Sequence, residues 1–145
     1  MSTLAMPAPS ETTLARRREI VAALERMLPK GCVIAEETGM RAYETDGLTA
    51  YRQMPFVVVL PETVDQVAAV LRYCHENDVR VVPRGAGTSL SGGALPLADA
   101  VLLSMMKFNR ILDVDFDNRT ATVQPGVTNL AVTQAVAQEG FYYAP

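Results

Sequence analysis

Glycines and hydroxyl side chains concentrate in one short stretch of this chain, residues 83–93. Four of the nine glycines of the chain fall between positions 85 and 93. Glycine loses more backbone entropy on folding than any other residue, so such a cluster indicates positive φ angles or a close approach to a ligand. Free backbone N–H groups beside the hydroxyls of Thr88 and Ser89 can cradle an anion, above all phosphate, and Arg84 adds a cation. A flexible surface loop is the simpler interpretation.

The flanking segments narrow the kind of nucleotide motif. Residues 79–82 and 101–104 are rich in β-branched and apolar side chains and are typical of strands, and Pro96 disfavours a helix between them. A Rossmann fingerprint requires a helix after the loop and a third glycine at the position of Leu90. A Walker A loop requires a lysine after its last glycine, and none follows Gly92. Both familiar motifs are therefore excluded.

Composition indicates one globular domain, or part of one. The chain has 145 residues, 49% of them hydrophobic, and a net charge of −3, which disfavours a general nucleic-acid-binding surface. No apolar run approaches the about 20 residues of a membrane span. Cys32 and Cys74 are far apart and are typical of reduced thiols in a cytosolic protein. His75 alone cannot build a metal cluster, and we expect it on the surface of a helix.

Hydrophobic periodicity predicts a mixed α+β chain. The expected elements are helix 11–28, strand 55–61, helix 63–77, strand 79–82, strand 101–104, a hairpin of 111–115 with 120–124, and helix 129–138 that Gly140 ends. Strands 55–61 and 79–82 with the helix between them form a βαβ unit, so these strands should be parallel with a right-handed crossover. The glycine stretch then leaves the carboxyl end of a strand, where open α/β sheets bind ligands.

Two local patterns add detail. The apolar residues of helix 63–77 are expected to share one face; they are Val64, Val67, Val70, Leu71 and Cys74. Between residues 32 and 53 the periodicity is weak, and the pair Asp46-Gly47 predicts a turn. Composition favours this turn over a ligand site.

The stretch from Pro83 to Ala94 resembles the pyrophosphate loop of FAD-linked oxidases of the vanillyl-alcohol-oxidase superfamily. The strand–helix–strand before it and residues 123–127 after it fit the same pattern. Residues 43–51 are similar to the branch that holds the glycolate oxidase FAD-binding subunit and D-lactate dehydrogenases. The resemblance runs from about Glu36 to Pro145, and it is specific because separate segments agree in order and spacing.

The resemblance implies an α+β, PCMH-type FAD-binding domain that is incomplete at its C-terminus. Residues 1–35 would be an N-terminal helical arm, and residues 36–145 the first part of the FAD domain. It implies no catalytic residue and no metal site in this chain. The residues implied in cofactor binding are Pro83, Arg84, Gly85, Ala86, Gly87, Thr88, Ser89, Gly92, Gly93, Pro125, Gly126 and Pro145.

The activity implied by the resemblance is oxidation of a 2-hydroxy acid, such as glycolate or D-lactate, to the 2-oxo acid with FAD as electron acceptor. The 145-residue chain alone is expected to be inactive. Expected partners are the substrate and further glycolate oxidase subunits, including an iron–sulfur one. The expected location is the cytoplasm, peripheral to the membrane through those subunits. Two alternatives remain open: a catalytically silent fragment, and a nucleotide-binding domain that does not use flavin.

Overall fold

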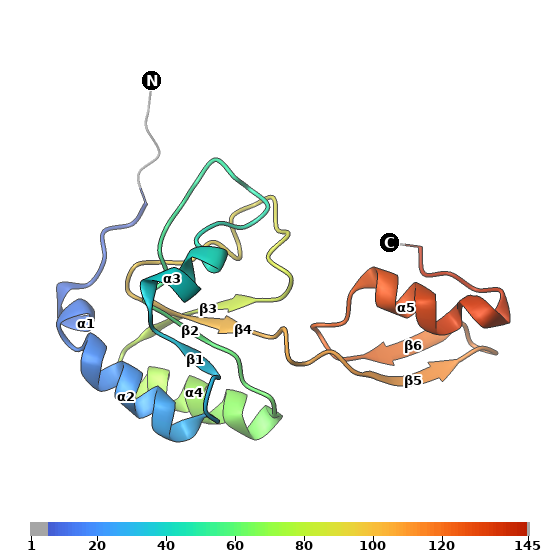
Figure 1. Cartoon of the computed structure of the whole chain (residues 1–145), viewed down its shortest axis with the longest axis horizontal. Helices are drawn as coiled ribbons and strands as arrows, with labels where there is room; N and C mark the ends of the chain where they lie inside the picture. The colour runs from blue at the N-terminus through green and yellow to red at the C-terminus, as the bar shows by residue number, and fades with distance from the viewer. Residues whose placement is uncertain (1–5, 145) are drawn as a thin grey trace.

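The computed structural model describes residues 6–144 and shows two layered parts side by side (Figure 1). The helices are α1 (Glu11–Ala15), α2 (Arg17–Met27), α3 (Glu37–Met40), α4 (Val64–Glu76) and α5 (Asn129–Val136), with two short 3-10 helices, η1 (Arg41–Tyr43) and η2 (Ala137–Glu139). The strands are β1 (Val33–Ile34), β2 (Val57–Val59), β3 (Arg80–Arg84), β4 (Ala100–Ser104), β5 (Ile111–Asp115) and β6 (Thr120–Val123). This is the mixed α+β architecture that the periodicity predicts.

The N-terminal part contains a four-stranded sheet with the order β1-β2-β4-β3. β2 and β3 each pair in parallel with β4, so the two strands of the expected βαβ unit are parallel, as predicted, with β4 between them. β1 adds an antiparallel strand beside β2 that the sequence did not predict. β3 includes Pro83 and lies at the sheet edge, where the missing N–H of proline is tolerated.

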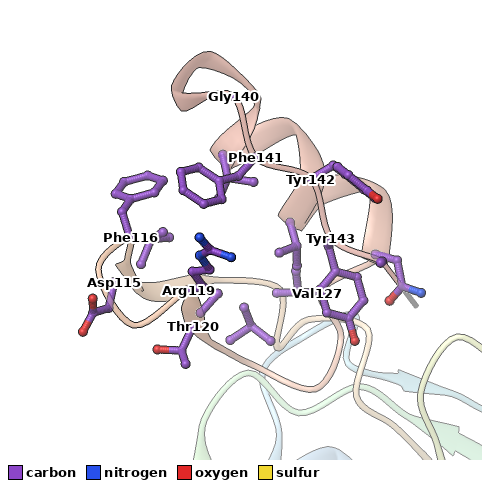
Figure 2. Close-up of a pocket in the computed structure, with 16 residues that line it drawn as sticks. Asp115, Phe116, Arg119, Thr120, Val127, Gly140, Phe141, Tyr142 and Tyr143 are labelled. Atoms are coloured by element: carbon purple, nitrogen blue, oxygen red, sulfur yellow. The ribbon is translucent and has the colours of Figure 1, made fainter.

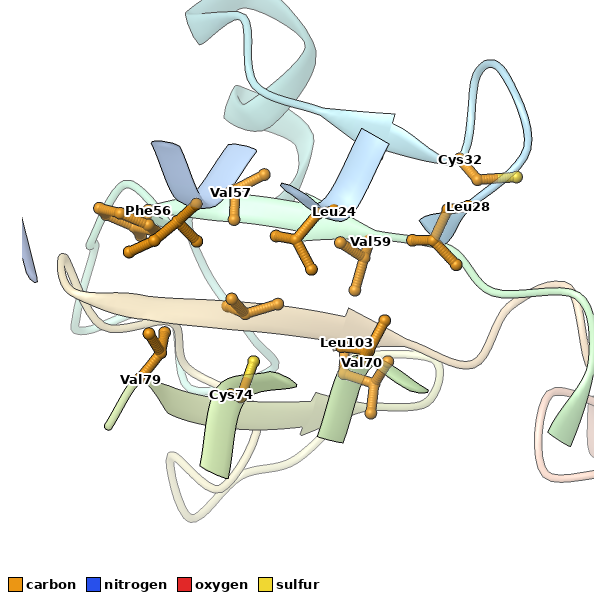
Figure 3. Packing of buried hydrophobic residues seen from close by; sticks show 12 residues of the cluster. Leu24, Leu28, Cys32, Phe56, Val57, Val59, Val70, Cys74, Val79 and Leu103 are labelled. Carbon is orange, nitrogen blue, oxygen red and sulfur yellow. The ribbon is translucent and has the colours of Figure 1, made fainter. Parts of the chain in front are cut away.

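The sheet is buried on both faces, which explains the unbroken apolar run from 56 to 60. Val57 and Val59 face α2 and α4, and they pack with residues such as Leu24 in one cluster (Figure 3). Val58 and Leu102 belong to a second cluster that includes Met40 of α3. Alternate residues of each strand therefore supply two separate cores, and the central strands hold the end of β3 firmly in place.

The C-terminal part consists of the β5–β6 hairpin with α5 beside it (Figure 2). The hairpin and the helix follow the sequence prediction closely. The Thr128 hydroxyl caps α5 by accepting from the Ala131 amide at 3.2 Å, and Gly140 ends the following 3-10 turn with a left-handed φ of 79°. Few side chains here are buried; Val132 and Val136 of α5 are the buried hydrophobics.

Two helix predictions need correction. The expected helix 11–28 is interrupted at Arg16, whose backbone is not helical (ψ 7°) and whose side chain donates to the Asn77 carbonyl at 3.2 Å. In α4, Val64 and Leu71 are 73% and 44% exposed and do not join the buried face. The buried face of α4 is narrower than the apolar spacing suggests, because only one side of the helix touches the sheet.

The N-terminal residues from 6 to 35 are not detached from the rest. Ile20 and Leu24 of α2 are fully buried in the core that the central strands form, and β1 belongs to the same sheet. A division between residues 35 and 36 stays a prediction. Among the described residues, no helix combines the length and apolarity that crossing a membrane requires. His75 is exposed, and Cys32 and Cys74 are buried free thiols.

Candidate cofactor-binding site

The glycine loop begins where β3 ends and continues toward β4. The Met105 amide donates to the Arg84 carbonyl at 2.8 Å, so the start of the loop is tied to the end of β4. Gly87 and Gly92 have φ angles of 75° and 74°, a conformation that favours glycine. Gly85, Ala86, Thr88, Ser91 and Gly93 are exposed, and Ser89 is half-buried. The loop therefore presents backbone and hydroxyls outward, as an anion cradle requires.

Arg84 points inward and not out of this cradle. It is 9% exposed, and its Nη1 donates to the carbonyl oxygens of Thr45 at 2.7 Å and Ala94 at 3.3 Å. Its Cζ lies 5.7 Å from the centre of the Tyr43 ring. The guanidinium of Arg84 thus binds backbone carbonyls on two sides of the loop, one before it in the sequence and one at its end.

The segment around Asp46 forms the wall behind the loop. Asp46 Oδ1 accepts from the Leu48 amide at 3.0 Å, which confirms the predicted turn. Gly47 touches the loop backbone: a Cβ on it would lie 2.7 Å from the Thr88 carbonyl oxygen and 2.9 Å from that of Ser89. Sequence composition favoured a plain turn, and the structure shows a turn that also supports the loop.

Asp46 is the counter-charge to Arg84. It is 5% exposed, and its Oδ2 has no hydrogen-bond partner. Burial lowers the pKa of Arg84, and the nearby Asp46 carboxylate opposes that shift. Arginine remains protonated in proteins regardless. A buried positive charge therefore lies inside the loop with an unpaired carboxylate oxygen in its vicinity.

The second predicted segment, Pro125-Gly126, lies beside the start of the loop. A Cβ on Gly85 would stand 3.9 Å from the Pro125 carbonyl oxygen. Gly126 donates to the Phe108 carbonyl at 2.7 Å, and a Cβ on it would lie 2.5 Å from the Met105 carbonyl oxygen. The structure thus brings together two predicted segments that lie far apart in the sequence. Pro145 lies outside the described residues.

A groove in the C-terminal part was not predicted. It has a volume of about 720 Å³ and lies between the hairpin, α5 and the final residues (Figure 2). Phe116 and Phe141 face each other across its end with ring centres 5.5 Å apart. None of the residues that line it belongs to the glycine loop. The alternating hairpin pattern signals an apolar face, but it does not show that the face is left uncovered.

The described residues offer a cradle for an anion and little else that could react. No group of three or more His, Cys, Asp or Glu side chains within residues 6–144 is placed to hold a metal ion. The loop has no charged side chain on its outer surface, so its binding capacity rests on amides and hydroxyls. Such groups suit the pyrophosphate of a dinucleotide.

Comparisons with known proteins identify the family of this chain and its fold. Residues 55–145 match the model of a family described as FAD binding domain. The chain is 50% identical over 129 residues to glycolate oxidase subunit GlcD of Escherichia coli (strain K12), covering 89% of this chain and 26% of that protein. It is 35% identical over 121 residues to the mitochondrial D-2-hydroxyglutarate dehydrogenase of Bos taurus, covering 83% of this chain and 22% of that protein. The chain thus spans about a quarter of these relatives.

A solved structure shows the same fold. The p-cresol methylhydroxylase structure with substrate bound superposes with a TM-score of 0.77 at 22% identity, covering 92% of this chain and 26% of that one. The expected PCMH-type α+β fold and the expected FAD cofactor are confirmed, and the alternative of a domain that does not use flavin is set aside. Because the family match takes in more than half of the chain, this protein belongs to the FAD binding domain family.

Proposed function

We propose that this chain is the FAD-binding portion of an oxidoreductase that oxidises a 2-hydroxy acid, of the glycolate or D-lactate type, to the 2-oxo acid. The observation that carries the proposal is the 50% identity over 129 residues to a glycolate oxidase subunit. The likeness to a D-2-hydroxyglutarate dehydrogenase supports the same substrate class. When bound, FAD supplies the electron acceptor for the oxidation.

The glycine loop is the proposed pyrophosphate site. The amides and hydroxyls from Gly85 to Ser89 would hold the two phosphates, since Gly85, Ala86 and Thr88 are exposed and Gly87 and Ser89 are half-buried. Close backbone packing supports this fit, because a Cβ at Gly47 would collide with the loop carbonyls. Pro83, Gly92, Gly93, Pro125 and Gly126 would line the same site, and Arg84 would act from inside. Pro145 stays a prediction.

We place no catalytic residue in this chain. The groups that bind the hydroxy acid and abstract its proton would come from other parts of the whole protein. We further propose that the chain works with additional subunits, including an iron–sulfur one, in the cytoplasm and at the inner membrane face through those subunits. The name of the bacterial relative, a subunit of glycolate oxidase, supports an assembly of several chains.

The test uses the complete reading frame that encodes this chain. We expect the purified product to carry FAD and its flavin absorbance to bleach when glycolate or D-lactate is added without oxygen. An L-hydroxy acid and acetate are the controls, and neither should bleach the flavin. A flavin spectrum that no 2-hydroxy acid changes would argue strongly against the proposal.

A second candidate function is a catalytically silent chain that binds nucleotide weakly or only pairs with partner subunits. The exposed apolar side chains of the C-terminal part favour it, among them Leu130 at 65% and Tyr142 at 76% exposure. Fluorescence quenching of FAD by the purified 145-residue chain separates the candidates. Tight stoichiometric binding of FAD by this chain would remove the second candidate.

A further inference from the structure

The Arg84 side chain is enclosed by the loop that it begins. Its Nη1 reaches three carbonyl oxygens, those of Thr45, Ala94 and, at 3.4 Å, Tyr43. Thr45 and Tyr43 belong to the wall behind the loop, and Ala94 closes the loop on the other side. A single guanidinium nitrogen therefore connects the wall to Ala94, where the loop ends, and Arg84 itself is the residue at which the loop begins.

Gly87 completes the enclosure. A Cβ on this residue would collide with Nη2 and would lie 2.5 Å from Cζ and 2.6 Å from Nε. The backbone of Gly87, with its φ of 75°, thus lies against the guanidinium plane. The guanidinium of Arg84 therefore supports the middle of the loop from inside.

We propose that Arg84 is a positioning residue that holds the amides of 85–89 in place from inside the loop and does not itself bind the pyrophosphate. This inference rests on the proposed FAD site. It makes the planar guanidinium the feature that matters, because Nη1 donates to the fixed carbonyls while the rest of the plane lies against Gly87. A lysine keeps the charge, but its flexible ammonium lacks that rigid geometry.

The burial of Arg84 supports a role in holding the loop and not in contacting the ligand. Arg84 is 9% exposed and Asp46 is 5% exposed, and the charge of Asp46 opposes the lowering of the Arg84 pKa by burial. A charge neutralised in this way contributes little to the attraction of an anion from solvent. A direct phosphate ligand would instead present its fork at the loop surface, where Gly85 and Thr88 are exposed.

The test compares Arg84→Lys and Arg84→Met with Arg72→Lys and Arg72→Met, which change an exposed arginine on α4. The first measurement is hydrogen exchange without ligand at the amides of Leu95 and Met105, which donate to the Gly92 and Arg84 carbonyls. The amide of Val67 in α4 is the internal reference. The second measurement is the dissociation constant of FAD at low and high salt.

We expect both Arg84 variants to lose protection at Leu95 and Met105 in the ligand-free protein, with Val67 unchanged. We expect both to lose at least about tenfold in FAD affinity, since hydrogen bonds from charged groups are among the stronger ones. The salt dependence of the remaining binding should equal that of the wild type. If Arg84→Met does not fold, Arg84→Lys carries the test.

The opposite pattern overturns the inference: Arg84→Lys keeps its FAD affinity and its amide protection, and Arg84→Met loses affinity together with part of the salt dependence. That pattern identifies a direct phosphate ligand. A wild-type protein that binds no FAD contradicts the proposed function instead. The exchange measurement needs no ligand, so it still decides whether Arg84 holds the loop.

Discussion

Gly87 lies against the guanidinium of Arg84 so closely that a Cβ on the glycine would stand 2.5 Å from Cζ. Arg84 and Gly87 are only three positions apart in the sequence, and the side chain of the first supports the backbone of the second. The loop is therefore shaped by its own first residue and by the wall around Asp46.

Replacing Gly87 by alanine should destabilise the loop in two ways. The left-handed backbone alone costs a non-glycine residue about 1–2 kcal/mol, and the collision with Arg84 adds to that cost. Gly31→Ala is the matched control, because Gly31 has a φ of 84° but nothing within 4 Å of its would-be Cβ. Urea denaturation should show the larger loss for Gly87→Ala, and that variant alone should lose FAD affinity. Equal losses in both variants would show that the collision does not matter.

Gly47→Ala tests the wall behind the loop. Its Cβ would press on the carbonyls of Thr88 and Ser89, which are backbone atoms and cannot rotate away. We expect FAD affinity to fall by about tenfold, comparable to the loss of one strong hydrogen bond. Gly39→Ala is the control, because its Cβ meets the Ile34 side chain, away from the loop. The prediction fails if calorimetry finds the same FAD affinity in both variants.

The buried thiol of Cys74 predicts a loss of stability in alkali. Burial raises its pKa to about 11, whereas the pKa of a cysteine in the unfolded chain is about 8.5. The protonated thiol thus stabilises the fold fully below the unfolded pKa, and this contribution disappears as the pH rises through about 11. Between pH 8 and 10.5 the free energy of unfolding should fall more steeply in the wild type than in Cys74→Ala. Parallel pH profiles would contradict the prediction.

Truncating a side chain at the centre of the sheet should cause a large loss of stability. Leu102 in β4 is fully buried, so Leu102→Ala should cost about 2–5 kcal/mol of unfolding free energy. Leu130 is 65% exposed on α5, and Leu130→Ala should change stability by less than about 0.5 kcal/mol. Chemical denaturation followed by circular dichroism measures both. A small effect at Leu102 would contradict the close packing of β4 in the second cluster.

Much of the fold follows from local sequence patterns. The apolar run from 56 to 60 predicts a strand, and the structure covers both of its faces. The predicted helix start at residue 63 is also confirmed, since the Thr63 hydroxyl accepts from the Gln66 amide at 3.3 Å. β1 was not predicted, since it has two residues and depends on pairing with β2. The exposure of Val64 was missed because periodicity gives the apolar side of a helix but not how far the sheet extends beneath it.

In the candidate site, too, some features follow from local sequence and others depend on tertiary contacts. The cluster of glycines predicts the loop, because glycine is favoured where the backbone takes a positive φ or approaches a ligand closely. The direction of Arg84 could not be predicted, since it depends on carbonyls near residue 45, far away along the chain. The approach of Gly85 to Pro125 is likewise a tertiary contact. Local composition thus locates the cradle, and long-range packing determines which of its residues face a ligand.

The central claim is that the amides of 85–89 hold the pyrophosphate of FAD. Titration of the ¹⁵N-labelled chain with FAD tests it directly, with riboflavin, which lacks the pyrophosphate, as the matched ligand. We predict that FAD moves the amide signals of Gly85, Gly87 and Ser89 and that riboflavin at equal concentration does not. Binding of FAD that leaves these signals in place, or equal shifts with riboflavin, would contradict the account.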